Sequence, residues 1–215
     1  MGKKYYIWFF SSLILFLLAT NAHAWDGQRK GFLLGFGIGS GFTSFTQNTQ
    51  KVHIYRDSNV VIVIREVPGV SVESGRQNKA AVMTDFKIGY APDNTWAIYY
   101  TSKVSWYGIT NTSGWDVTIA NGLGALAVSY WFKPQAPSPF IAGGFGYSTW
   151  ALPFEDNTPD TWIGVGLFAG GGYEFSRHVS VEGYLSWGKP KEKEFNLEVS
   201  SNALSLMFTV NVLGY

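Results

Sequence analysis

Five charged residues are the side chains of this chain best placed to do chemistry. They are Asp85, Lys87, Lys103, Glu174 and Glu182. Each lies in a stretch whose apolar residues recur at every second position, and each occupies the other parity, which a β-strand points to its opposite face. A slip of one residue would turn these charges toward the apolar face. A Lys or Arg at the midplane of a bilayer costs roughly 2–4 kcal/mol, so we expect them to fix the strand register.

Two functions could follow from charges that all point into the interior of a barrel. One is a gated ion path. The other is a paired network that plugs the interior, because unpaired charges there would be very costly. A barrel of eight strands has an interior just filled by side chains, whereas porins have 16–18 strands. The eight strands counted below therefore favour the plug.

Two further patterns point to chemistry only weakly. The glycine-rich run 37–41 lacks the G-x-G-x-x-G spacing, and no helical pattern follows it, so a nucleotide loop is not expected. His53 has no Ser and acid at a recognisable spacing. The chain has no cysteine and only two histidines after its leader, so we predict no disulfide, no metal site and no cofactor.

The elements that must position the charges are strands, most clearly in the stretch 81–106. Apolar residues from Val82 to Tyr90 fall on one parity, a turn follows at 91–94, and alternation restarts from Trp96 to Trp106. Each run is long enough to cross a bilayer as a tilted strand, which takes about 9–11 residues. An apolar face with aromatic ends and a polar opposite face predict a hairpin of a transmembrane barrel.

The composition agrees with such a barrel. The 215 residues suffice for one domain and a leader. Aromatic residues make up 17% and charged residues only 14%, against about 25% charged in soluble domains. A mean hydropathy of +0.02 is too low for a helical membrane protein with repeated apolar runs. Removing Lys3 and Lys4 with the leader leaves a net charge near −1, so no nucleic-acid partner is expected.

Residues 1–24 have the three parts of a secretory signal peptide. Lys3 and Lys4 form a positive region, residues 5–18 an apolar core, and Ala22-His23-Ala24 a cleavage site before Trp25. The alternative is an uncleaved anchor, but this core is shorter than the roughly 18 apolar residues of a spanning helix. We therefore expect cleavage between Ala24 and Trp25, leaving 25–215 as an exported barrel domain.

Alternating patterns predict eight antiparallel strands in an all-β, up-and-down barrel. They cover about 31–42, 81–90, 96–106, 117–132, 140–149, 163–175, 179–187 and 204–212. In the fourth strand, Val117 and Ile119 have the opposite parity to Leu126 and Val128, which predicts a bulge near Asn121-Gly122. Connections alternate between long (43–79, 107–116, 155–160, 189–194) and short (91–94, 133–139, 176–178). Short periplasmic turns and longer extracellular loops have this asymmetry.

The connection 43–79 contains two β-like runs, 52–56 and 60–64, on either side of Asp57-Ser58-Asn59. We interpret them as a hairpin that projects on the extracellular side. Inserting both runs into the wall would instead give ten strands. The first run is short and has charged neighbours, which favours projection. Its Val-Ile partner could recruit another strand by edge addition, or could pack against neighbouring loops.

The pattern resembles the small eight-stranded outer-membrane barrels, the opacity-protein superfamily that includes OmpX and the OmpA transmembrane domain. The resemblance covers Gly31 to Tyr215 and is carried by residues 31–37, 171–176 and 181–183. It implies an outer-membrane location, with outer-membrane lipid and lipopolysaccharide as surroundings. It also implies insertion by the barrel assembly machinery, which would read the terminal aromatic Tyr215. Val212 and Tyr215 differ in parity, so either Leu213-Gly214 bulges or Tyr215 lies past the strand.

His178-Val179-Ser180 is similar in spelling to the His-x-Ser of lipid A deacylases. In our topology this tripeptide lies at a periplasmic turn, whereas lipid A occupies the outer leaflet. His178 is therefore interpreted as a turn residue, and catalysis is not expected.

Large aromatic residues near both sets of connections predict two interfacial girdles, where amphipathic rings favour the headgroup level. Their members are Tyr90, Trp96, Tyr130, Phe140 and Tyr173 near the short turns, and Trp106, Trp115, Trp150 and Trp162 near the long loops.

The sequence thus predicts an outer-membrane barrel with a plugged lumen and a structural or surface-interaction role carried by its loops, with a possible surface partner of 43–79. One alternative is a small channel or a binder or transporter of an apolar ligand. A second is a lipid A-modifying enzyme.

Overall fold

The computed structural model describes residues 28–49, 52–56, 59–63, 75–110, 116–154, 161–194 and 197–215. The strands are β1 (Gly31–Thr49), β2 (Val52–Arg56), β3 (Asn59–Val63), β4 (Arg76–Ala91), β5 (Trp96–Thr110), β6 (Asp116–Trp131), β7 (Ser138–Ala151), β8 (Trp162–Ser176), β9 (Val179–Glu194) and β10 (Leu197–Gly214). No helix among the described residues has the length and apolar character needed to cross a bilayer.

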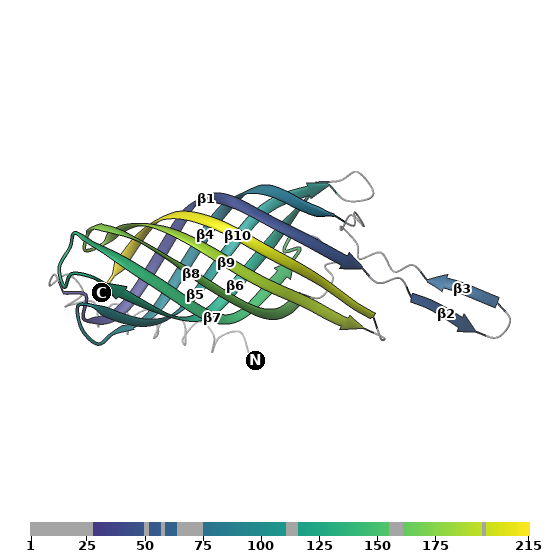
Figure 1. The fold of residues 1–215 in the computed structure, drawn as a ribbon, viewed down its shortest axis with the longest axis horizontal. Helices are drawn as coiled ribbons and strands as arrows, with labels where there is room; N and C mark the ends of the chain where they lie inside the picture. The colour runs from purple at the N-terminus through teal and green to yellow at the C-terminus, as the bar shows by residue number, and fades with distance from the viewer. Residues whose placement is uncertain are drawn as a thin grey trace, which may run out of the picture.

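Eight strands close into one antiparallel ring, in the order β1-β10-β9-β8-β7-β6-β5-β4 (Figure 1). The ring closes where β1 pairs with both β4 and β10. Closure leaves the ring without an unpaired edge, so its backbone groups are satisfied within the wall. The predicted eight-stranded up-and-down barrel is confirmed.

The barrel is apolar outside and largely polar inside. Phe36, Phe145 and Val165 expose 59%, 73% and 65% of their surface, while Lys87, Lys103 and Glu182 are buried. Removing each such side chain from water is favourable by about 1.5–3 kcal/mol, so this outer surface is suited to contact with lipid. A closed ring with alternating apolar-out and polar-in positions is the architecture of a transmembrane barrel.

Connections at one end of the barrel, the turn end, are the short ones predicted: 92–95, 132–137 and 177–178. At the other end, the loop end, the strands run further than their apolar pattern indicates. Residues 43–49, 76–79, 107–110 and 189–194, which we expected in loops, continue the strands. The reason is that backbone pairing does not require an apolar outer face, so the wall extends beyond the apolar band as a polar rim.

The bulge predicted near Asn121-Gly122 is wrong. Strand β6 keeps one register with β5 from Asp116 to Tyr130. Val117 and Ile119 are buried because they point into the lumen, whose loop-end part is apolar. A register shift occurs elsewhere, between Glu174 and Ser176 at the turn end of β8.

Strands β2 and β3 pair only with each other, as a two-stranded sheet separate from the ring. Figure 1 shows them past the tip of β1, beyond the loop end of the ring, and along the chain they lie between β1 and β4. The two runs thus pair as a hairpin, and the ring of eight strands excludes the ten-stranded alternative.

Two residues near the contact between β1 and β10, Gly37 and Tyr215, have positions that the sequence pattern left unexplained. A Cβ atom on Gly37 would clash with the amide of Asn211, its register partner, so glycine makes room for that side chain in the lumen. Tyr215 lies past the end of β10 and is buried, with its ring 6.3 Å from that of Trp131. The parity mismatch of Tyr215 is therefore resolved by its lying past the strand.

Candidate functional site: the filled lumen

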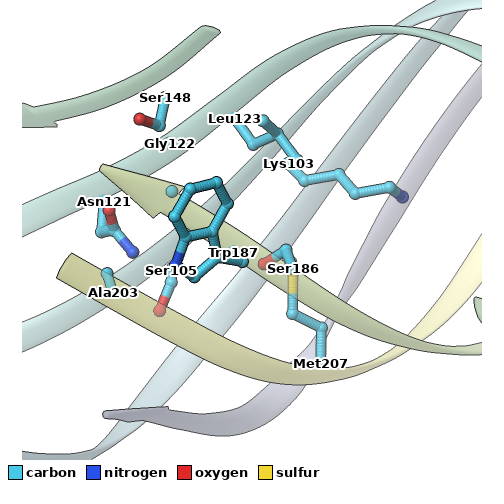
Figure 2. Close-up of a pocket in the computed structure, with 11 residues that line it drawn as sticks. Lys103, Ser105, Asn121, Gly122, Leu123, Ser148, Ser186, Trp187, Ala203 and Met207 are labelled. Carbon is cyan, nitrogen blue, oxygen red and sulfur yellow. Dashed lines mark hydrogen bonds between the residues drawn. The ribbon is translucent and has the colours of Figure 1, made fainter. Parts of the chain in front are cut away.

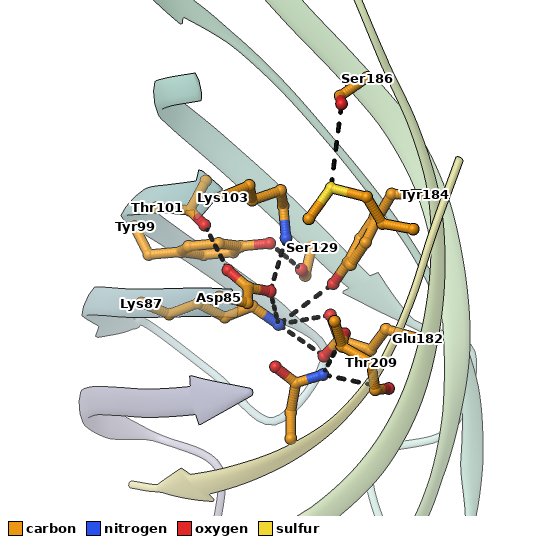
Figure 3. A network of polar contacts seen from close by, with 12 residues as sticks. Asp85, Lys87, Tyr99, Thr101, Lys103, Ser129, Glu182, Tyr184, Ser186 and Thr209 are labelled. Carbon is orange, nitrogen blue, oxygen red and sulfur yellow. Dashed lines mark hydrogen bonds and ion pairs between the residues drawn. The ribbon is translucent and has the colours of Figure 1, made fainter. Parts of the chain in front are cut away.

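The centre of the lumen holds four of the five predicted charges. Lys103 Nζ lies 2.6 Å from Asp85 Oδ2, and Lys87 Nζ lies 2.5 Å from Glu182 Oε1. A third contact of 3.5 Å, between Lys87 Nζ and Asp85 Oδ2, joins the two pairs into one network (Figure 3). All four side chains are almost fully buried, and their two positive and two negative charges balance. Pairing of this kind is what a buried charge requires.

Hydroxyl and aromatic groups complete this network. Thr101 Oγ1 donates to Asp85 Oδ1 at 2.8 Å, and Ser180 Oγ donates to Glu182 Oε1 at 3.0 Å. Lys87 Nζ also donates to the Tyr184 hydroxyl at 3.2 Å. The ring centroid of Tyr184 lies 3.5 Å from Lys103 Nζ, a cation–π contact. The surrounding groups therefore hold both ammonium groups in fixed positions.

Glu174 does not join this network. It lies nearer the turn end, where Oε2 accepts from Arg29 Nε at 2.8 Å and also from Nη2. Arg29 precedes β1 and crosses the mouth of the barrel. Its Nη1 donates to the carbonyl oxygens of Asn94 (2.7 Å) and Lys133 (2.8 Å), and its guanidinium stacks over Trp131. One arginine thus ties three regions of the turn end together.

An aromatic cluster fills the loop-end part of the lumen. Trp150 and Trp162 stack with ring centroids 4.6 Å apart, and Phe45 and Tyr107 stack at 5.2 Å. These four side chains are at most 3% exposed. Ile109, Val117, Ile119 and Leu152 are buried in the same core.

Between the central network and the aromatic cluster lies a cavity of about 10 Å³, beside Lys103, Ser105 and Met207 (Figure 2). A space of this size holds about one water molecule. Thr43 next to it donates or accepts hydrogen bonds with Ser105 and, at 2.8 Å, with Ser205. The described part of the lumen is thus filled by three successive layers: the Arg29 pair, the charge network and the aromatic cluster.

The aromatic girdle is only partly as predicted. Tyr90, Trp96 and Tyr173 are exposed on the outer face, and Tyr130 and Trp106 lie half-buried there. Phe140, Trp150 and Trp162 instead point into the lumen, so their assignment to the girdles is wrong. Ile141 and Ile163, which directly follow Phe140 and Trp162, are exposed on the outer face. Because adjacent residues of a strand point to opposite faces, Phe140 and Trp162 must point inward. Trp115 lies outside the described residues, as do Ala24 and Trp25.

His178 and Ser180 do not form a catalytic pair. The His178 ring donates from Nδ1 to the Leu213 carbonyl oxygen at 2.8 Å, at the turn between β8 and β9. Ser180 is fully buried and donates to Glu182. Within the described ranges, no three His, Cys, Asp or Glu side chains are grouped so that they could hold a metal ion.

Arg29 is the functional residue that the sequence reasoning missed. The signal for it was charge balance: the five predicted interior residues comprise three carboxylates and only two ammonium groups. A buried carboxylate without a counter-charge is very unfavourable, so one more buried cation was required. The strand pattern could not supply it, because Arg29 lies before the first strand.

A scan against protein-family models and a search of curated proteins gave no match. Solved structures with a similar fold include Neisserial surface protein A, at 14% identity and a TM-score of 0.47 over 84% of this chain and 96% of that one. The outer membrane protein OprG from Pseudomonas aeruginosa gives 12% identity and a TM-score of 0.43 over 87% and 98%. At these values the likeness concerns the fold alone and carries no functional argument.

Proposed function

We propose that this protein is an integral outer-membrane barrel that does not conduct and that serves as a scaffold for its extracellular loops. The observation that carries the proposal is the filled lumen, in which Lys87, Lys103, Asp85 and Glu182 pair with one another. Ions could pass only if this network came apart, which would leave charges buried without partners. The turn end then faces the periplasm and the loop end the exterior.

Planar-bilayer recording of the full mature chain tests the closed lumen. We expect no discrete openings under conditions in which a porin from the same preparation conducts. Discrete openings that disappear in Lys103→Met would show that the lumen is a path and would overturn the proposal.

The β2–β3 hairpin supports a surface-interaction role. It projects beyond the loop end and pairs only with itself, so each of its strands keeps an edge that the barrel does not use. Unpaired strand edges can add a strand from another protein. Cells producing the chain with residues 50–75 replaced by a short Gly-Ser turn should keep the barrel but lose surface binding or aggregation. Unchanged surface behaviour would exclude the hairpin as the interacting element.

A second function, binding of an apolar ligand, is favoured by one observation in the aromatic cluster. The Tyr107 hydroxyl interacts with the Trp150 indole, whereas the indole N–H of Trp162 is buried and has no hydrogen-bond partner among the described residues. Each such group costs about 1–3 kcal/mol. An apolar molecule with an oxygen acceptor would satisfy this donor once the stacked rings of Trp150 and Trp162 moved apart to admit it. A shift in tryptophan emission on adding a long-chain alcohol, lost in Trp162→Phe, would support this function.

No catalytic role is proposed, because Ser180 contacts a carboxylate rather than His178. Mass spectrometry of lipid A from cells with and without the protein tests this. An altered acyl pattern that is lost in His178→Ala would establish an enzyme instead.

A further inference from the structure

We propose that the outer face of β9 and β10 near the loop end binds the phosphorylated headgroup of lipopolysaccharide through Lys189, Lys191 and Asn202. The inference rests on the proposed function, since lipopolysaccharide occupies the outer leaflet of an outer membrane. It goes beyond that function by assigning a lipid-binding site to named side chains on the wall.

The outward residues of β9 change in character from the turn end to the loop end. Val181 and Leu185 are exposed to lipid, Trp187 follows, and the next two outward positions are the exposed Lys189 and Lys191. Indole rings concentrate at the headgroup level of a membrane. The two ammonium groups, which belong to residues about 7 Å apart along the strand, therefore lie just where lipid phosphates begin.

The neighbouring strands give the lysines an apolar border and a further donor. Val165 and Ile163 on β8 are the register partners of Lys189 and Lys191, and they expose 65% and 57% of their surface. On β10 the exposed Asn202 accepts a hydrogen bond on Oδ1 from Trp187 Nε1 at 2.8 Å. Because its oxygen is engaged by this indole, the amide presents Nδ2 as a donor. The patch thus combines two cations and an amide donor beside a surface that acyl chains can cover.

The polar rim above the apolar band favours a glycolipid over a phospholipid. Strand β9 continues to Glu194 and β10 begins at Leu197, both beyond the lysines. Farther around the ring, Arg76 of β4 donates to Ser44 of β1 at 2.6 Å on the same polar rim. A wall that extends this far past the acyl chains has room to contact sugars, which a phospholipid headgroup lacks.

Charge is not uniform around the rim. Strand β6, three places from β9 in the ring, begins at the exposed Asp116, which accepts a hydrogen bond from Thr110 at 2.9 Å. A carboxylate there disfavours phosphate, whereas the lysines of β9 attract it. The β6 side of the rim is therefore a less favourable place for a lipid phosphate than the position of Lys189 and Lys191.

Binding of bisphosphorylated lipid A to the full mature chain in detergent micelles tests the proposal. The variant Lys189→Gln/Lys191→Gln should bind about tenfold or more weakly, because each lysine near an anionic lipid surface contributes a measurable part of the attraction. The matched control, Lys30→Gln/Lys133→Gln, removes two exposed cations at the turn end and should bind as the wild type does. Dephosphorylated lipid A should bind the wild type and the lysine variant equally weakly.

Three outcomes would overturn the proposal. Equal binding by the lysine variant would exclude these side chains. Equal affinity for phosphatidylglycerol would show a generic anionic surface, and displacement of lipid A by millimolar inorganic phosphate would show a site for a soluble anion. Circular dichroism and heat-dependent gel migration of each variant report the barrel separately. A wild-type chain that did not form a folded barrel would contradict the proposed function. A folded barrel that bound lipid A without selectivity would contradict only this site.

Discussion

Lys103 lies directly opposite Asp85 in the register of β4 and β5, and its Nζ atom is 2.6 Å from the Asp85 carboxylate. The contact therefore joins cross-strand neighbours that share the inner face of the barrel. A one-residue slip between β4 and β5 would separate the two and turn one of them toward lipid. The same pair that fills the lumen thus also determines how the first hairpin aligns.

Replacing Lys103 by Met should lower the free energy of unfolding by about 3–5 kcal/mol, because the longer contact to Lys87 is then the one ion pair that the structure gives the buried Asp85. Urea unfolding in micelles, followed by gel migration, measures the change. The double variant Asp85→Asn/Lys103→Met should recover part of the loss because it removes both charges. A single variant as stable as the wild type would contradict the network.

Replacing Arg29 by Ala should destabilise the barrel by a similar amount, about 3–5 kcal/mol, because Glu174 is then buried without its counter-charge. Glu174→Gln in the same chain should restore stability in part. Lys30→Ala provides the control, since Lys30 is the exposed neighbour of Arg29. If Arg29→Ala behaved like Lys30→Ala in urea unfolding, the arginine would not hold the turn end.

Asp93 should make the turn between β4 and β5 sensitive to acid. Hydrogen bonds from the Thr95 hydroxyl and backbone N–H, with a further one from Trp96 N–H, lower the pKa of the Asp93 carboxyl below its ordinary value of 3.8. A lowered pKa in the folded state stabilises the fold above the unfolded pKa, and this contribution is lost as the pH falls through the folded value. Carbon-13 NMR titration of the carboxyl should give a pKa below 3.8. Thr95→Val should raise it.

Arginine substitutions on the outer face should cost more at mid-depth than at the membrane border. Phe208 lies midway along the apolar outward run of β10, whereas the exposed Phe132 follows β6 at the turn end. Phe208→Arg should therefore cost about 2–4 kcal/mol and Phe132→Arg about 0–1 kcal/mol. Unfolding in lipid vesicles measures both. Equal costs would contradict the placement of the bilayer around the barrel.

Single-tryptophan variants should separate the inward from the outward indoles. Trp96 is 45% exposed on the outer face, whereas Trp150 is 1% exposed within the lumen. Lipids brominated on their acyl chains should quench the emission of a chain that retains Trp96 more strongly than that of one that retains Trp150. Stronger quenching of Trp150 than of Trp96 would show that Trp150 faces lipid, as a girdle residue does.

The alternation of apolar residues predicted the barrel well because successive residues of each strand face lipid and lumen in turn. It failed where the lumen itself is apolar. Phe140, Trp150 and Trp162 are inward residues of the same chemical type as the girdle, so residue type alone could not place them. Val117 and Ile119 led to a wrong bulge for the same reason. The strand ends were underestimated because pairing beyond the membrane leaves no apolar signature.

For the candidate site, the sequence predicted which charges face the lumen but not all of their partners. Parity alone brought Asp85, Lys87, Lys103 and Glu182 to the inner face, and the structure joins them. Parity could not show that Glu174 pairs with Arg29, because that contact links a strand to a segment outside the alternation. Which charges meet across a barrel depends on the stagger of the strands, and no local pattern encodes that.

The β2–β3 sheet shares no ladder with the eight-stranded ring. An insertion, an epitope or a foreign binding loop placed between the ends of β1 and β4 would therefore leave every barrel pairing as it is. The position is suited to grafting peptides for display on a cell. Sequence changes there would leave the strand pairing of the barrel unchanged.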